Sequence, residues 1–308
     1  MTVLPLFRYP TTVSWVDDDD VLLQVATDII GQDENLITFN SPSSFLSFIS
    51  TYVPHLETVH FTAPKTECDD YETVNHLPID INSLAFFQLP TQPERKKEIS
   101  LLIVDYHMPE ITGLELCRHL KNKPFKKILL TGEATIKQAV AAFNEGIIDC
   151  FLQKDSPTLI DDIKKHLCIL KDEYFLDQSK SLLLHLETDK KIPLSDPIFV
   201  SFFKSWCKEN EIQEYYLFDK QGNMQVVNSK GKSCFVIHTD NSLDQFCEIY
   251  GDNQDASHLI ADVKERKKVP FFGIGLEGWQ CNKNDWPQHF YVPEVLEGRE
   301  KYYWFVKE

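Results

Sequence analysis

Several features that point to common classes of protein are missing from this sequence of 308 residues. Its eight cysteines are scattered, and no two form a Cys-x-x-Cys pair, so neither a zinc site nor a redox pair is indicated. No apolar run approaches the roughly 18 residues that span a bilayer. The N-terminus lacks a basic start followed by a long apolar core. We therefore expect a cytoplasmic protein with reduced cysteines and no membrane association.

An excess of basic residues is also missing. The formal net charge is −16, whereas a surface that binds nucleic acid needs a basic stripe. The run Lys264–Lys268 fits a solvated helix end better than a DNA contact. No compact helix-turn-helix with a basic recognition helix is apparent. Direct DNA binding by this protein is therefore not expected.

Motifs of the familiar nucleotide enzymes are absent too. The sequence has no GGDEF, EAL or HD pair and no Walker-type Gly-x₄-Gly-Lys-Ser/Thr. Gly273-Ile-Gly275-Leu-Glu-Gly278 has the spacing of a dinucleotide fingerprint, but no helix clearly follows it, which favours a turn-rich loop. We expect no enzymatic output. An unrecognised nucleotide-binding, ligand-binding or catalytic domain remains the alternative for the second half of the chain.

What the sequence does contain is an alternation of short apolar runs with amphipathic stretches over its first half. This alternation predicts a parallel sheet with right-handed crossovers. Residues 55–98 carry four prolines and little periodicity, so we expect a long insertion there, with short elements near 58–61 and 83–89. The expected strands are 13–16, 36–39, 101–105, 127–131 and 148–153, and the expected helices are 21–30 (closed by Gly31), 45–52 (started by Ser41), 114–121, 134–145 and 158–186.

Carboxylates stand where two of these strands end. The apolar run Leu101–Val104 leads directly into Asp105, at the carboxyl end where open α/β sheets place their ligands. Four aspartates follow the first strand. A helix N-terminus accounts for Asp19 and Asp20, but Asp17 ends an apolar strand. A cluster of carboxylates at such an edge suits a hard divalent cation such as Mg²⁺.

Further residues of defined type stand at or shortly after the strand ends. They are Asp18, Met108-Pro109 and Gly113 after Asp105, Thr131 followed by a small residue, and Lys154 with Phe151 three residues before it. In this order and at these places, residues 12 to about 170 resemble the receiver domain of two-component response regulators. The resemblance implies a five-stranded, doubly wound, flavodoxin-like α/β fold.

The resemblance also implies roles for the individual residues. Asp105 would take a phosphoryl group as nucleophile. Mg²⁺ would be held by Asp18, Asp105 and the backbone carbonyl of His107, with Asp17 acting through water. Lys154 and Thr131 would each contact a phosphoryl oxygen. A purely structural role remains the alternative for each: Lys154 could be a solvated lysine, and Thr131 could be an ordinary strand-end hydroxyl.

Phe151 would be the switch residue that swings inward when Thr131 moves, although a core phenylalanine is an equal alternative. A sensor histidine kinase or a phosphotransfer protein would be the partner, and self-phosphorylation and dephosphorylation would be the only chemistry. One departure concerns Asp155, which stands where receivers usually have a proline. Lys154 could therefore be held differently from the family pattern.

The remaining sequence predicts a second, smaller domain. We expect a receiver over 1–170, a helical linker over 171–196 and an α+β output domain with a mainly antiparallel sheet over 197–308. This domain should hold a helix capped by Ser195, a hairpin turning at Gln221–Asn223 and a closing hairpin of 289–292 with 301–306. The layout is similar to response regulators whose output domain does not bind DNA, among them a quorum-sensing regulator. Apolar positions that continue past Leu170 predict a homodimer.

Overall fold

The computed structural model describes residues 3–30, 34–64, 79–132, 135–187, 193–252, 254–276 and 278–308. Two compact units divide the chain. The parallel-sheet unit comprises Tyr9–Val59 and Thr91–Gln178, and the antiparallel-sheet unit comprises Met1–Arg8, His60–Pro90 and Ser179–Glu308. Most of the predicted insertion thus groups with the C-terminal part of the chain. The ranges 1–170, 171–196 and 197–308 remain a prediction about independently folding domains.

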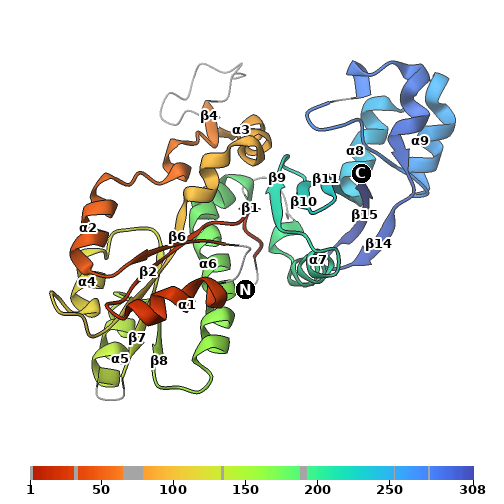
Figure 1. Cartoon of the computed structure of the whole chain (residues 1–308). Coiled ribbons are helices and arrows are strands. Elements are labelled where there is room, and N and C mark those ends of the chain that lie inside the picture. Colours follow the sequence, from red (N-terminus) through yellow and green to blue (C-terminus); the bar gives the residue numbers. More distant parts are fainter. Residues whose placement is uncertain are drawn as a thin grey trace. The chain divides into compact units, whose positions relative to one another are not determined.

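The parallel-sheet unit confirms the predicted α/β fold. Its strands pair only in parallel, in the order β3-β2-β6-β7-β8 (Figure 1). The central strand β6 is buried along its whole length, as its unbroken apolar run predicts. These strands are β2 (Thr12–Val16), β3 (Asn35–Phe39), β6 (Ile99–Asp105), β7 (Lys126–Thr131) and β8 (Cys150–Gln153).

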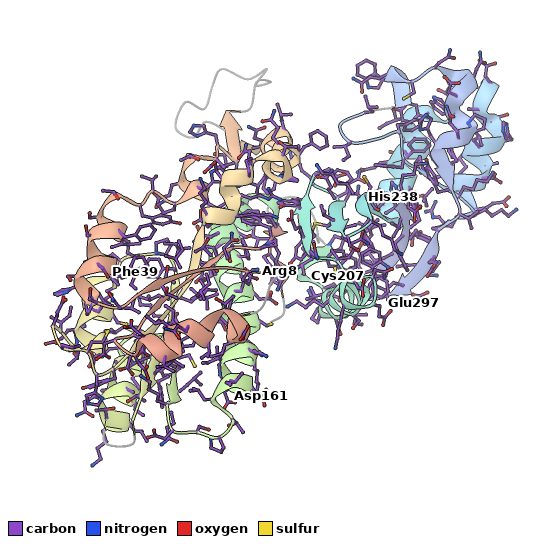
Figure 2. The ribbon with its side chains drawn as sticks, viewed as in Figure 1. Arg8, Phe39, Asp161, Cys207, His238 and Glu297 are labelled. Carbon is purple, nitrogen blue, oxygen red and sulfur yellow. The ribbon has the colours of Figure 1, made fainter. Side chains whose placement is uncertain are left out.

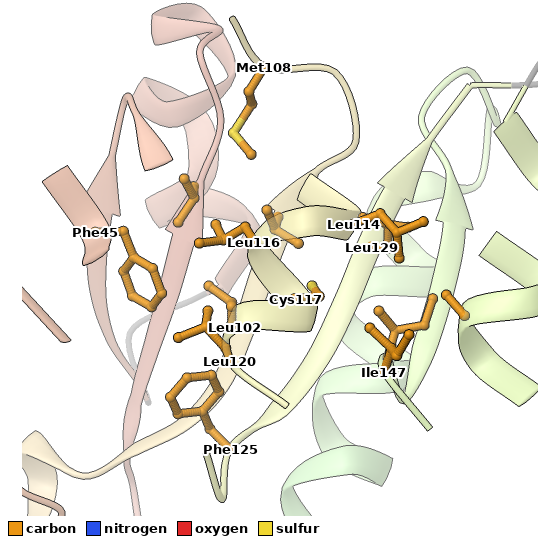
Figure 3. Close-up of a cluster of buried hydrophobic side chains, with 14 of the residues drawn as sticks. Phe45, Leu102, Met108, Leu114, Leu116, Cys117, Leu120, Phe125, Leu129 and Ile147 are labelled. Atoms are coloured by element: carbon orange, nitrogen blue, oxygen red, sulfur yellow. The ribbon is translucent and has the colours of Figure 1, made fainter. Parts of the chain in front are cut away.

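Helices cover both faces of this sheet. One face buries a cluster that includes Phe45, Leu114 and Ala139, from α2, α4 and α5 (Figure 3). The other face packs against α1 and α6, with Ile29 and Ile163 among the buried side chains. The helices are α1 (Asp20–Ile30), α2 (Pro42–Thr51), α4 (Gly113–His119), α5 (Ile136–Asn144) and α6 (Leu159–Glu187).

The predicted helix starts can be checked residue by residue. Ser41 caps α2, because its hydroxyl accepts a hydrogen bond from the Ser44 amide at 3.3 Å. Thr112 caps α4 in a reciprocal capping box with Glu115. The predicted stop at Gly31 lies outside the described residues.

The insertion contributes short elements: α3 lies where one was expected near 83–89, whereas the element expected near 58–61 is replaced by η1 and β4 on either side of it. The short elements include a two-stranded antiparallel pair and a helix whose Phe86 ring packs at a tilt against the rings of Phe7 and Phe61. In chain order they are η1 (His55–Thr58), β4 (Thr62–Pro64), β5 (Ile79–Ile81), α3 (Ser83–Gln88), η2 (Leu89–Thr91) and η3 (Pro93–Lys97).

The antiparallel-sheet unit confirms the α+β prediction for the C-terminal region. Its main sheet has the order β1-β9-β10-β11-β15-β14, and every pair in it is antiparallel. The predicted hairpin is present, with Met224 opposite Leu217. The strands are β1 (Phe7–Arg8), β9 (Glu214–Leu217), β10 (Met224–Asn228), β11 (Gly231–Thr239), β14 (Glu294–Glu297) and β15 (Lys301–Lys307), and the helices are α7 (Pro197–Glu209), α8 (Asp240–Tyr250) and α9 (Ser257–Lys264).

Two local predictions in this unit are wrong. Strand β13 (Phe290–Tyr291) pairs with β12 (Val269–Pro270), whereas β15 forms its hairpin with β14. Pro293 separates β13 from β14, and the tight turn that follows lies at Gly298, whose amide bonds to the Glu300 carbonyl at 2.9 Å. The cap of α7 is Asp196 and not Ser195. The Asp196 carboxylate accepts bonds from the Ile198 amide at 2.9 Å and the Arg299 amide at 2.6 Å.

Helix α6 alters the argument for a homodimer. Phe175 and Leu182, which continue the apolar stripe past Leu170, are buried within a single chain. Ile160, predicted to belong to the same stripe, is 49% exposed. The stripe therefore needs no second copy to cover it, and dimerisation remains a prediction without this support.

A buried carboxylate at the start of β6 leads to a prediction about pH. Glu98 is fully buried and accepts bonds from the Tyr174 hydroxyl at 2.5 Å and the Leu56 amide at 3.0 Å. Burial outweighs these bonds and raises the pKa of Glu98 above its usual value. The folded chain then holds this proton more tightly than the unfolded chain. Its stabilising effect is complete below the unfolded pKa and is lost as pH rises through the folded pKa.

Glu98→Gln should remove this dependence. We expect the stability of the wild type relative to Glu98→Gln to fall as the pH rises through the folded pKa of Glu98, because the buried carboxyl then loses its proton. Urea unfolding of both proteins at several pH values measures the difference. Glu145→Gln, at an exposed position on the end of α5, is the matched control. If the difference in unfolding free energy between the wild type and Glu98→Gln did not change with pH, Glu98 would not have a raised pKa in the folded chain.

Candidate functional site

The carboxyl ends of four parallel strands meet at one edge of the sheet. Asp17 follows β2, Asp105 ends β6, Thr131 ends β7, and Lys154 follows β8. Because β2, β6, β7 and β8 are consecutive neighbours in the sheet, the topology brings these four side chains to one place. This is the arrangement that the strand ends predict.

Lys154 connects two of the carboxylates. Its Nζ lies 3.0 Å from Asp17 Oδ2 and 3.2 Å from Asp105 Oδ1. Asp17 is fully buried and Asp105 nearly so. The Lys154 amide donates to the Thr131 carbonyl at 2.9 Å, and the Ser156 amide donates to the Gln153 carbonyl at 3.1 Å. Lys154 thus reaches the site over a short turn, with Asp155 in the place of the usual proline.

Three carboxylates form a candidate metal site. Asp17, Asp18 and Asp105 each offer an oxygen, and these oxygens all lie within 4.8 Å of one another. Asp18 is exposed, whereas the other two are buried. Asp19 has a separate task, because its carboxylate accepts bonds from the Val21 and Leu22 amides at the start of α1. The predicted helix-start role of Asp19 is therefore confirmed, whereas Asp17, which also accepts a bond from the Asp19 amide at 2.9 Å, remains a predicted metal-site residue.

The electrostatics of the site leave room for more positive charge. Burial raises the pKa of Asp105, Lys154 opposes that shift, and the charges of Asp17 and Asp18 add to it, so the pKa stays above its usual value. Burial lowers the pKa of Lys154, but its bonds to Asp17 and Asp105 outweigh burial and raise it. Lys154 therefore stays protonated. One ammonium offsets only part of three carboxylates, and oxygen donors of this kind fit a hard divalent cation.

The remaining predicted residues occupy distinct surroundings. Thr131 is fully buried, and its hydroxyl is hydrogen-bonded to the hydroxyl of Thr135, a residue the sequence did not single out. Phe151 is half-buried and packs edge-on against Phe143 at 6.4 Å between ring centroids. His107 has an exposed side chain directly after Tyr106. The role of its backbone carbonyl as a metal ligand stays a prediction.

Comparison with known proteins places this geometry in a family. Residues 89–164 match the family described as the response regulator receiver domain. The chain contains a response regulator receiver domain. The matched range includes Asp105, Thr131 and Lys154, and Asp17 and Asp18, which follow β2, lie outside it. The resemblance stated from the strand-end residues is confirmed.

A characterised relative supports the receiver assignment. The transcriptional regulatory protein FlgR of Helicobacter pylori is 26% identical over 200 residues, which is 65% of this chain and 43% of FlgR. The chain thus matches less than half the length of that relative. What FlgR does as a whole protein is accordingly not transferred to this chain.

A solved structure matches nearly the whole chain. The Legionella pneumophila response regulator LqsR is 25% identical to it, with a TM-score of 0.79, over 99% of this chain and 89% of that chain. The likeness includes both the receiver and the C-terminal region. In the described part of the chain, no helix has the length and apolar character needed to cross a membrane.

Proposed function

We propose that this receiver accepts a phosphoryl group on Asp105 and that the protein is a phosphorylation-controlled regulator. The observation that carries the proposal is the contact of Lys154 with both Asp17 and Asp105 beside the three-carboxylate cluster. A phosphoryl transfer of this kind needs positioning and charge neutralisation more than covalent assistance. The site supplies fixed groups for both.

Each residue has a defined task in the proposed step. A carboxylate oxygen of Asp105 forms a bond to phosphorus while the bond from phosphorus to the donor's leaving atom breaks, and that atom keeps the electron pair. Lys154 neutralises charge on a phosphoryl oxygen. Thr131 gives its hydroxyl to another, for which it must leave its bond to Thr135. Phe151 then follows Thr131 and changes the surface around β8.

Mg²⁺ fits the residues present. Asp18 and Asp105 would hold it directly together with the His107 carbonyl, and Asp17 would act through water. When bound, the ion neutralises charge that develops on the phosphoryl group. The support for this assignment is the cluster of three carboxylates, two of which are contacted by the Lys154 ammonium in the part of the chain that the structure describes.

Removal of one metal ligand gives a thermodynamic test. Mg²⁺ at ten times its Kd should stabilise the protein by about 1.4 kcal/mol through linkage. Asp18→Ala should abolish most of the Mg²⁺-dependent shift in Tm, because Asp18 is an exposed ligand whose loss costs little packing. Thermal unfolding with Mg²⁺ or with EDTA measures the shift, and Asp20→Ala serves as control. An undiminished shift in Asp18→Ala would place the ion elsewhere.

The partner and the output complete the proposal. A sensor histidine kinase or phosphotransfer protein would supply the phosphoryl group in the cytoplasm, where the free thiols of the described cysteines would persist. The output would act through protein contacts or homodimerisation, with no catalysis of its own. Val140 (41% exposed) and Phe143 (49%) offer an apolar face on α5 for such a contact. A role in quorum sensing rests on the chain layout alone.

A direct contact with DNA receives no support from the basic run at the end of α9. Arg266 is paired with Asp240 at 2.8 Å and with Asp244 at 2.7 Å. Lys268 is paired with Asp262 at 2.9 Å. These cations already have anionic partners, which weakens their attraction for phosphates.

The direct test of the proposed function is phosphoryl uptake. The full chain, with Mg²⁺ and a small phosphodonor such as acetyl phosphate, should gain one phosphoryl group that is stable in acid and released by base. Intact-mass spectrometry before and after base treatment measures it. Absence of uptake, or uptake of a base-stable group, would contradict the proposal.

A further inference from the structure

The antiparallel-sheet unit contains a pocket that the proposed phosphoryl chemistry does not use. Its volume is about 550 Å³, within the range of small-molecule sites. It lies among α3, the turn between β9 and β10, the side of α8 that carries Ser242, Phe246 and Tyr250, and the loop that follows β12. All of its described lining residues belong to this one unit.

The pocket wall is largely aromatic. Phe218 lies 6.1 Å from Phe271 and Phe246 lies 4.8 Å from Tyr250, between ring centroids. The aromatic side chains that line it are Phe87, Phe218, Phe246, Tyr250, Phe271 and Phe272. Such a wall binds apolar ring or chain surfaces, and its faces also attract cations.

The glycine-rich loop is part of the same wall. Gly273 and Gly275 have positive φ angles of 124° and 70°, which glycine adopts without strain. A Cβ atom at Gly278 would lie 3.1 Å from both the Phe272 and the Tyr250 rings. The Gly273–Gly278 spacing therefore serves a turn-rich loop fitted against aromatic rings. This outcome confirms the loop interpretation over a dinucleotide fingerprint.

The charge of the pocket has one sign. Asp219 is the one described lining side chain that carries a charge at neutral pH, and no lysine or arginine lines the described part of the pocket. His238 (Figure 2) is buried, and burial lowers its pKa to about 4, so its ring is neutral. Its Nε2 bonds to the Pro270 carbonyl at 2.9 Å. Ser242 lies 3.4 Å from its Nδ1.

Asp219 is held by structural bonds and lines the pocket. One oxygen accepts from the Gln221 and Asn223 amides at 2.9 and 3.1 Å, and the other accepts from Asn223 Nδ2 at 2.5 Å. These bonds, with a further one from the Gly222 amide, hold the β9–β10 turn, and a carboxylate with about four acceptor positions can share one of them with a ligand. Burial raises the pKa of this carboxyl, so a cation beside it would relieve an unfavourable environment.

We propose that this pocket binds a small organic cation, a primary amine carried on an aromatic or aliphatic body. The ammonium group would donate to a carboxylate oxygen of Asp219, and the apolar body would lie against the aromatic wall. Phosphate and carboxylate ligands, nucleotides included, are disfavoured because they would meet Asp219 with no cation to offset it. The inference is independent of phosphoryl transfer at Asp105.

A set of matched probes tests the charge requirement on the full chain. The probes are 2-phenylethylamine, its neutral isostere 2-phenylethanol, the anion 3-phenylpropionate and adenosine monophosphate, titrated by calorimetry and by ligand-observed NMR. We expect the amine to bind at least tenfold more tightly than the alcohol. We expect the two anions to show no saturable binding. Equal binding of the alcohol, tighter binding of either anion, or no saturable binding of the amine up to 10 mM would overturn the proposal.

Two variants locate the site. Asp219→Asn should reduce the preference for the amine over the alcohol to within twofold, whereas Asp285→Asn, at an exposed position of the same unit, should keep it. Because Asn keeps the acceptor oxygen but not the charge, the turn can persist, and thermal unfolding checks that it does. Phe87→Ala replaces a side chain that is 40% exposed, and it should weaken the binding of the amine three- to fivefold without loss of the fold. The site would be refuted if Asp219→Asn kept the full preference for the amine over the alcohol, or if Phe87→Ala bound the amine with unchanged affinity.

Discussion

Asp105→Asn should lose phosphoryl uptake entirely, down to the background of a mock reaction. The amide of asparagine has nearly the shape of the carboxylate but is not a nucleophile at neutral pH. It also removes one oxygen ligand from the three-carboxylate cluster. Asp105 is 5% exposed and its Oδ1 lies 3.2 Å from Lys154 Nζ, whereas Asp17, whose Oδ2 lies 3.0 Å from the same nitrogen, is fully buried. Radiolabel incorporation or intact mass measures the loss.

The matched control is Asp161→Asn, at an exposed residue in the first turn of α6 (Figure 2). It removes the same charge outside the three-carboxylate cluster and should label like the wild type. Circular dichroism and thermal unfolding establish that both variants fold. Labelling of a folded Asp105→Asn at the wild-type level would remove Asp105 from the mechanism.

Gly113→Ala should destabilise the parallel-sheet unit by about 3 kcal/mol, the upper part of the usual range for overpacking. In an ordinary helix this change is favourable by about 0.5–1 kcal/mol. Here a Cβ atom would overlap the carbonyl oxygen of Asp105 and lie 2.9 Å from its carbonyl carbon. Both are backbone atoms and cannot rotate away, so the overlap outweighs the helix preference. The phosphorylation rate should fall as well, because Asp105 must shift.

Gly132→Ala is the control for stability. It has no heavy atom within 4 Å of the position of its added Cβ. Denaturant unfolding of the two variants should therefore separate them by at least about 2 kcal/mol. If Gly113→Ala and Gly132→Ala were equally stable, α4 would lie farther from β6 than in the structure.

Local pattern was enough to predict the candidate site. The apolar runs before Asp17, Asp105 and Lys154 each form a strand of one parallel sheet, so the residues after them meet at one edge. Thr131 shows the limit of this reasoning. Its position could be predicted, but its bond to Thr135 depends on how the chain turns into α5, and no spacing rule encodes that turn.

Pairings distant in sequence could not be predicted from pattern. Strand β1 has two residues and pairs with β9, more than 200 residues later. The partner of β15 was misassigned because β13 and β14 are both short and lie on either side of Pro293. The Asp196 cap was missed by one residue, since Ser195 and Asp196 are both good capping residues and only the fold selects Asp196, through its bond to the Tyr302 hydroxyl at 2.9 Å.

The most direct test of the central claim is to locate the phosphoryl group. The full chain is phosphorylated with a small phosphodonor with and without Mg²⁺, the acyl phosphate is reduced with borohydride, and the peptides are sequenced by mass spectrometry. The account predicts a single reduced residue at position 105 that depends on Mg²⁺. Reduction at Asp17, Asp18 or any other carboxylate, or equal reduction at position 105 without the metal, would contradict it.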